Sequence, residues 1–307
     1  RSVTEMSDSS EVNKDRTLAP REPESDDDKR QRIILPRGRL YDLAGRGKTF
    51  ARVVKAQPGS PTVLLLHGWT ATADLNWYSS YDVLDDRYGL VALDHRGHGR
   101  GIRSKKKFSL EDCADDAVAL LDQLGIDQVI VCGYSMGGPI AQLLWRRHPQ
   151  RVLGLVLCAT AATFSSSKAE QIRFAAIGAL AHAIRLVPAA LREIAAEQML
   201  TSKSGKDLRQ WARGELRRHD PLKLVQAGRS IGTFDSRHWI SSIDVPVSLV
   251  VTTRDDVVSI GRQLALAKAI PGSTVHSVDG THTACVGRAT QFRQALLAAI
   301  KDVDEKN

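Results

Sequence analysis

The sequence contains few cysteines and no long hydrophobic run. Its four cysteines, Cys113, Cys132, Cys158 and Cys285, are scattered along 307 residues, and none forms a cluster with zinc-ligand spacing. This distribution argues against a disulfide framework and indicates reduced thiols, three of them in apolar stretches where we expect burial. The chain has no run of about 18 apolar residues, so we expect no transmembrane segment.

The first 30 residues contain almost no large apolar side chains and are rich in charged residues, serine and proline. Such a composition cannot bury enough surface to offset the entropy lost on ordering, so residues 1–30 are predicted to be a disordered polar tail. An acidic docking segment around Asp26–Asp28 is the alternative. No apolar segment typical of a signal peptide is present, and we expect a cytoplasmic protein.

Aromatic residues are also scarce, at 5% of the chain, although the formal net charge is +8. Basic stretches occur at residues 100–107 and 213–219, and neither has the interleaved aromatic residues that stack on nucleic-acid bases. We therefore expect no nucleic-acid partner. The basic stretches are predicted to form a solvated surface, and a cationic rim that attracts an anionic substrate or a lipid surface is the alternative.

From about residue 32, short apolar runs alternate with amphipathic segments. Strands are expected at 32–35, 49–54, 63–66, 90–93, 128–132, 152–158, 247–252 and 274–278. Helices are expected at 76–86, 109–124, 136–148 and 291–303, with Ser109 capping the second of them and Gly125 ending it. This alternation predicts an α/β fold with a mostly parallel sheet.

Residues 161–240 interrupt the alternation because they contain helical patterns without strands. These patterns cover 169–185, 189–199 and 206–218, and proline residues punctuate them. We therefore expect a helical cap inserted at 161–240, with the core formed by residues 31–160 and 241–307.

The strongest chemical signal is the pattern Gly-x-Ser-x-Gly at residues 133–137, between a predicted strand and a predicted helix. A serine in a sharp strand-to-helix turn adopts strained backbone geometry, and glycines two residues away on each side relieve the clashes. The side chain of Ser135 is then exposed above a helix N-terminus, which favours developing negative charge. A glycine-rich turn with an incidental serine is the alternative, and the correct flanking elements disfavour it.

A nucleophilic serine needs a base and an acid that orients the base, and both are expected after later strands. His282 follows the last predicted strand and is expected to be the base. Asp255 is the favoured acid, and the adjacent Asp256 is the alternative. Among the other histidines, we expect His148, His182, His219 and His238 at the surface, His276 in a structural role, and His95 and His98 at most in the pocket wall.

A tetrahedral intermediate also needs hydrogen-bond donors for its oxyanion. The backbone N–H of Met136, next to the serine, is expected to be one donor. The second is expected from the loop after the strand at 63–66, where Gly68 permits a turn and the N–H of Trp69 is the candidate.

These motifs resemble those of the α/β-hydrolase superfamily, in its esterase, haloperoxidase-like and C–C hydrolase branch. The resemblance covers about residues 45–303 and rests on HGW at 67–69, DHRGHG at 94–99, GYSMGG at 133–138, RRHPQRVLGLVLCATAA at 146–162, TTRDDVV at 252–258 and GTH at 280–282. It implies an eight-stranded sheet, a cap, and a triad of Ser135, Asp255 and His282. The chain departs from the pattern at Gly101, where relatives often carry serine.

The resemblance and the motifs together predict a serine esterase that acts on a small-molecule acyl substrate with an apolar part and needs no metal or organic cofactor. The serine nucleophile argues against the epoxide hydrolase and haloalkane dehalogenase branches, which use an aspartate. C–C bond hydrolysis, acyl transfer and perhydrolysis with the same triad remain alternatives. A receptor on the hydrolase fold with little turnover is a third hypothesis.

Overall fold

The computed structural model describes residues 33–165, 167–170, 172, 176 and 206–307. Its strands form one eight-stranded sheet in the order β1-β2-β4-β3-β5-β6-β7-β8. The strands are β1 (Gly38–Leu43), β2 (Gly47–Val54), β3 (Thr62–Leu66), β4 (Gly89–Leu93), β5 (Val129–Tyr134), β6 (Val152–Cys158), β7 (Val247–Thr252) and β8 (Thr274–Val278). The β1/β2 and β2/β4 pairs are antiparallel and the remaining pairs are parallel, which confirms the predicted fold class.

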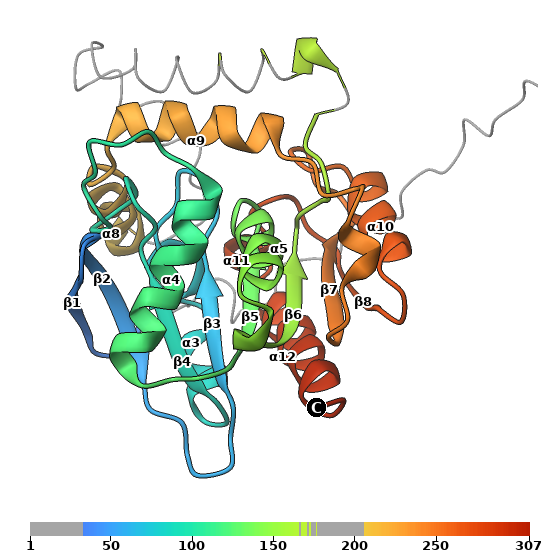
Figure 1. The fold of residues 1–307 in the computed structure, drawn as a ribbon, viewed down its shortest axis with the longest axis horizontal. Coiled ribbons are helices and arrows are strands. Elements are labelled where there is room, and N and C mark those ends of the chain that lie inside the picture. The colour runs from blue at the N-terminus through green and yellow to red at the C-terminus, as the bar shows by residue number, and fades with distance from the viewer. Residues whose placement is uncertain (1–32, 166, 171, 173–175, 177–205) are drawn as a thin grey trace, which may run out of the picture.

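Helices cover both faces of the sheet (Figure 1). One layer contains α4 (Leu110–Leu124), α5 (Gly137–Arg147) and α10 (Ile260–Ala269), and the other contains α2 (Ala73–Trp77), α3 (Tyr81–Asp85), α11 (Ala284–Gly287) and α12 (Ala289–Asp304). Successive residues of β3 alternate between the two layers: Leu64 and Leu66 pack in one core cluster, Val63 and Leu65 in the other. Burial on both faces explains why the central strands are continuous apolar runs.

The segment between β6 and β7 contributes α8 (Lys206–Leu216) and α9 (Pro221–Thr233), and its described residues add no strand to the sheet. Figure 1 shows α9 lying across the carboxyl ends of the central strands. Short 3-10 turns, η1 (Pro149–Arg151) and η3 (Ile240–Ser242), precede β6 and β7. The helix expected at 169–185 lies largely outside the described residues, and the one expected at 189–199 lies entirely outside them.

Helix α4 has the two ends predicted from the sequence. The Ser109 hydroxyl accepts a hydrogen bond of 3.1 Å from the Asp112 N–H, and Gly125 ends the helix with φ at +66°. All four cysteines are buried and unpaired, as expected for reduced core thiols. Within the described chain, no helix has both the length and the apolarity needed to cross a bilayer.

The predicted strand at 32–35 is wrong. Residues 33–37 form no strand, and the edge strand is β1, which turns back into β2 through Gly45 at φ +69°. Pro36 lacks an N–H for sheet pairing, and β1 carries mostly exposed side chains, including Leu40 at 61% exposure, so no apolar run marks it.

The single helix predicted at 76–86 is two short helices, α2 and α3. Thr72 caps α2 by accepting from the Leu75 N–H, so the first helix starts earlier than expected. The break falls at Ser79, whose hydroxyl donates to the Cys285 carbonyl at 2.6 Å. A tertiary contact with a distant segment therefore ends the helix, and no local pattern reports it.

Candidate active site

Ser135 occupies the turn between β5 and α5 in a left-handed backbone conformation with φ at +52°. Hydrogen bonds with the end of β6 and the loop after it help to hold this strained residue. Its N–H donates to the Cys158 carbonyl at 2.9 Å, and its carbonyl accepts from the Thr160 hydroxyl at 2.8 Å. A non-glycine residue in this conformation persists only where the surroundings over-determine it, and such strain is typical of functional sites.

The glycines around Ser135 are required by close backbone packing. A Cβ atom on Gly133 would lie 2.2 Å from the Gly137 carbonyl oxygen, and one on Gly137 would lie 2.2 Å from the Leu66 carbonyl oxygen. A Cβ atom on Gly138 would meet the Thr160 side chain at the same distance. The Gly-x-Ser-x-Gly spacing therefore answers a steric demand of this turn.

The structure brings Ser135, His282 and Asp255 together from three segments of the chain. The Nε2 atom of His282 lies 2.9 Å from the Ser135 Oγ atom, and its Nδ1 atom lies 2.8 Å from the Asp255 Oδ2 atom. Asp255 follows β7 and His282 follows β8, so both stand at the carboxyl edge of the sheet. Asp256, the alternative acid, has an exposed side chain.

The Asp255 carboxylate is fully buried and held by several donors. It accepts from the Thr252 hydroxyl at 2.6 Å, the Val258 N–H at 2.7 Å and the Gln263 amide at 3.2 Å. Burial alone raises the pKa of this carboxyl, but the hydrogen bonds and the charge of His282 outweigh it and lower the pKa. Asp255 is therefore held as an ionised acceptor facing Nδ1.

Sequence reasoning missed two residues that support this trio. Gln263 lies in α10, a helix that was not predicted, and contacts Asp255. The Tyr134 hydroxyl donates to the His282 carbonyl at 2.7 Å across 148 residues of sequence. Tyr134 stood in the variable position of the serine motif, so the pattern offered no signal for this contact.

The two predicted oxyanion donors belong to the segments that follow the neighbouring strands β5 and β3. Met136 is the N-cap residue of α5, directly after the serine. Trp69 follows β3, and its indole N–H donates to the Leu224 carbonyl of α9 at 2.9 Å. Gly68 lies against the serine, since a Cβ atom there would be 3.3 Å from the Ser135 Cβ atom.

A cluster of four buried histidines lies beside this loop. It consists of His67, His95, His98 and His219, with ring centroids of neighbouring members 4.2–5.5 Å apart. Burial lowers the pKa of His67 to about 3 and the pKa values of His95 and His98 well below their usual range. Among the described residues, no group of three His, Cys, Asp or Glu side chains is arranged to hold a metal ion.

The expectation that His219 lies at the surface is wrong. His219 lies in the turn between α8 and α9, and its ring is buried. Its Nδ1 atom accepts from the Gly99 N–H at 3.0 Å, and its Nε2 atom lies 3.1 Å from the Thr70 carbonyl oxygen. Of the other histidines, His238 is exposed, His148 and His276 contact Asp115 and Asp302, and His182 lies outside the described residues. The backbone at His95 also gives a steric reason for glycine at position 101, where relatives often carry serine. A Cβ atom on Gly101 would lie 2.1 Å from the His95 carbonyl oxygen.

The first basic stretch does not form a uniform rim. Arg100 turns inward and pairs with the buried carboxylates of Asp74 and Asp94 at 2.9 and 3.3 Å, and with Glu215 of α8 at 3.4 Å. Lys105–Lys107 are exposed. A hydrogen bond of 2.5 Å from Arg103 to the Arg218 carbonyl brings the two basic stretches side by side.

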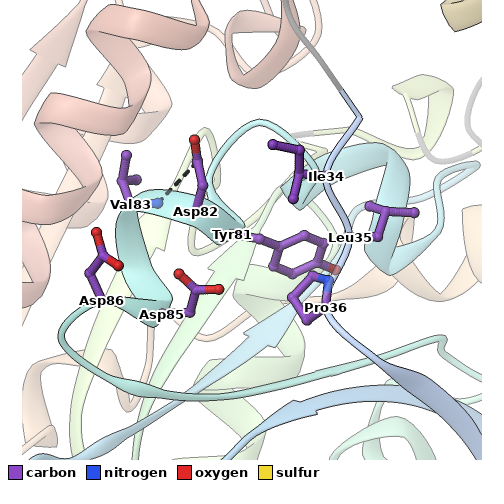
Figure 2. A pocket seen from close by; sticks show the side chains of 8 residues that line it. All are labelled: Ile34, Leu35, Pro36, Tyr81, Asp82, Val83, Asp85 and Asp86. Carbon is purple, nitrogen blue, oxygen red and sulfur yellow. Dashed lines mark hydrogen bonds between the residues drawn. The ribbon is translucent and has the colours of Figure 1, made fainter.

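A separate pocket lies between α3 and the segment before β1 (Figure 2). Its lining residues are Ile34, Leu35, Pro36, Tyr81, Asp82, Val83, Asp85 and Asp86. Burial and the neighbouring carboxylates of Asp86 and Asp82 raise the pKa of Asp85. The lining contains neither Ser135 nor a histidine, so this pocket is distinct from the serine site.

Comparisons with known proteins identify the family of the fold. The family described as alpha/beta hydrolase fold matches residues 61–289. The chain is 25% identical to 3-oxoadipate enol-lactonase 2 of Acinetobacter baylyi over 228 residues, which cover 73% of this chain and 83% of the relative. It is 28% identical to pimeloyl-[acyl-carrier protein] methyl ester esterase of Chromobacterium violaceum over 242 residues, covering 77% and 92%.

Solved structures show the same fold. The esterase from Exiguobacterium antarcticum superposes with a TM-score of 0.74 at 20% identity, covering 87% of this chain and 100% of the other. The enol-lactonase from Burkholderia xenovorans superposes with a TM-score of 0.71 at 23% identity, covering 86% and 100%. At these identities the likeness establishes the architecture alone.

Proposed function

Because the chain belongs to the α/β-hydrolase family, we propose that it is a serine hydrolase that cleaves a small carboxylic ester through an acyl-enzyme on Ser135. The observation that carries the proposal is the continuous hydrogen-bonded path from Asp255 through His282 to Ser135, with contacts of 2.8 and 2.9 Å. The strained backbone of Ser135 supports it independently.

In the proposed reaction, the Ser135 oxygen attacks the ester carbonyl carbon while His282 Nε2 takes the hydroxyl proton. The tetrahedral intermediate collapses, the C–O bond to the alcohol breaks, and His282 returns the proton to the leaving alkoxide. Water then attacks the acyl-enzyme by the same proton path and releases the acid. Asp255 keeps the proton on Nδ1, so that Nε2 is the free base.

The carbonyl oxygen becomes negative in both tetrahedral intermediates, and we infer that the N–H groups of Trp69 and Met136 stabilise it. Both groups belong to backbone held by the fold, so they need no reorganisation during the reaction. The N-terminus of α5 lies at the same place and adds a favourable dipole.

For the substrate we infer a small ester or lactone with an apolar part. The names of the two relatives, an enol-lactonase and a methyl ester esterase, describe substrates of this chemical class. We further infer that residues 161–240 act as a cap over the site. The contact between Trp69 and α9 supports this arrangement because it ties the expected oxyanion loop to that segment.

The test is labelling by a fluorophosphonate probe, read by intact mass, followed by hydrolysis of p-nitrophenyl esters of graded length, a methyl ester and a lactone. Wild type is expected to gain one adduct, and Ser135→Ala none. Ser80→Ala is the matched control, since Ser80 is also buried but lies between α2 and α3, outside the three segments that carry Ser135, Asp255 and His282. An unlabelled, folded wild-type protein, or a Ser135→Ala variant that keeps most of its turnover, would refute the mechanism.

A further inference from the structure

Asn76 of α2 contacts the loop that carries Trp69. Its Oδ1 atom accepts a hydrogen bond of 2.6 Å from the Gly68 N–H, the shorter of the two contacts that hold Gly68. Its amide nitrogen faces the Cys285 Sγ atom at 3.5 Å. The residue is 8% exposed, so water does not replace these partners easily. Sequence reasoning assigned Asn76 no function.

The carbonyl group of Gly68 is also fixed by a hydrogen bond. The His67 Nδ1 atom lies 2.8 Å from the Gly68 carbonyl oxygen, while His67 Nε2 accepts from the His95 N–H at 2.9 Å. Because Nε2 accepts, the proton of the neutral ring is on Nδ1 and is donated to the carbonyl. The low pKa of His67 keeps the ring neutral.

These two contacts determine where the next N–H points. The carbonyl of Gly68 and the N–H of Trp69 belong to one planar peptide unit and point in opposite directions. Fixing the carbonyl with His67 and the preceding N–H with Asn76 therefore fixes the direction of the Trp69 N–H. A Cβ atom on Gly68 would lie 3.3 Å from the Ser135 Cβ atom, so the peptide unit that carries this N–H adjoins the residue of the nucleophile.

We propose that Asn76 is a positioning residue that aims the Trp69 N–H at the oxyanion. The inference rests on the proposed function, and it adds a residue outside the serine, histidine and aspartate trio. A donor that is fixed before the reaction stabilises the developing charge more than one that must reorient. Asn76 accordingly acts on the transition state and has little effect on substrate binding.

The contact of Asn76 with Cys285 offers an internal control. Cys285 is three residues after His282, and the Ser79 hydroxyl holds its carbonyl at 2.6 Å. Ser79→Ala loosens this segment without touching Gly68. If Asn76 acted only by supporting the segment of His282, Ser79→Ala and Asn76→Ala would have similar effects.

The experiment compares Asn76→Ala, Asn76→Leu and Ser79→Ala in ester hydrolysis and in inhibition by a trifluoromethyl ketone, which forms an oxyanion with the serine. Both Asn76 variants leave the Gly68 N–H without its acceptor, and Leu nearly preserves the side-chain volume. We expect kcat to fall about 10- to 100-fold, less than the loss on deleting a donor itself. KM is expected to stay within about threefold, and inhibitor affinity is expected to fall by the same factor as kcat.

The acid limb of the kcat–pH profile is expected to keep its midpoint, because His282 and Asp255 are untouched. The proposal is overturned if either folded Asn76 variant keeps kcat and inhibitor affinity within twofold of wild type. It is also overturned if KM rises at constant kcat, or if Ser79→Ala reproduces the loss. Activity retained by Ser135→Ala would instead refute the proposed function, so the two failures are distinguishable.

Discussion

The Asp255 carboxylate faces the His282 Nδ1 atom at 2.8 Å, whereas the side chain of the next residue, Asp256, is exposed. The sequence alone left a one-residue ambiguity between these two aspartates. The loop geometry supports the proposal of Asp255, because the Thr252 hydroxyl and the Val258 N–H both bind its carboxylate and orient it toward the imidazole.

Asp255→Asn is therefore expected to lower kcat by about 10⁴-fold, because an amide at this position favours the wrong tautomer of the base. Asp256→Asn, one residue away, is expected to keep kcat within about twofold. Steady-state hydrolysis of a p-nitrophenyl ester measures both. Equal losses in the two variants, or a larger loss at Asp256, would contradict the assignment of the acid.

The second prediction concerns Gly137, a glycine in the tight turn at Ser135. In Gly137→Ala the new Cβ atom lies 2.2 Å from the Leu66 carbonyl oxygen in the central strand β3, so the backbone must move. We expect a loss of about 3 kcal/mol in unfolding free energy and a large loss of kcat. Urea unfolding and the ester assay test this directly.

Gly261→Ala in α10 is the matched control for that substitution. A Cβ atom there meets nothing within 4 Å, and alanine favours helix, so we expect up to about 1 kcal/mol of added stability. If Gly137→Ala were as stable and active as Gly261→Ala, the steric account of the serine turn would be wrong.

The parts of the fold that could be predicted are those in which local pattern and burial coincide. Strand β6 is a continuous apolar run because both of its faces are covered, and its predicted bounds of 152–158 agree with the structure. The edge strand β1 has mostly exposed side chains, so no hydrophobic period marks it. Helices α2 and α3 were merged because the contact that separates them comes from Cys285.

The residues of the candidate site also divide into those with a local sequence pattern and those set by tertiary contacts. Ser135 was identified because its turn imposes a local glycine spacing that can be read from the sequence. Asn76, Gln263 and Tyr134 have roles that depend on partners elsewhere in the fold, such as the His282 carbonyl 148 residues from Tyr134. Single polar residues in such contacts carry no local signature, and only the folded chain identifies them.

The buried pairing of Arg100 leads to a third prediction. Its side chain is 22% exposed and forms ion pairs with the carboxylates of Asp74, Asp94 and Glu215, which are at most 5% exposed. Arg100→Met leaves these charges with too few partners, so we expect a loss of about 3–5 kcal/mol in unfolding free energy. Chemical denaturation at neutral pH measures the loss.

Arg237→Met is the control for the removal of an ion pair. Arg237 pairs with Asp235 at the surface, where water screens the charges, so we expect no measurable change in stability. Similar effects of the two substitutions would mean that the Arg100 network contributes no more than a surface pair.

The histidine cluster predicts that stability falls on acidification. Burial, followed by the neighbouring rings of His67 and His98, lowers the pKa of His95 well below its usual value, so the native ring stays neutral. In the unfolded chain His95 binds a proton as the pH falls through about 6.5. The unfolded state then holds more protons than the native state, which makes the unfolding free energy rise with pH and decline below about pH 6.5.

Each buried neutral histidine contributes up to about 1.4 kcal/mol per pH unit to this slope. His95→Leu removes one such group, and within the described chain neither ring nitrogen of His95 has a hydrogen-bond partner to lose. We therefore expect urea unfolding between pH 7 and pH 5 to give a shallower dependence in His95→Leu than in wild type. His238→Phe serves as the control for removing an imidazole from the surface. Parallel curves for wild type and His95→Leu would show that His95 takes up no additional proton on unfolding, which would contradict the neutral buried cluster.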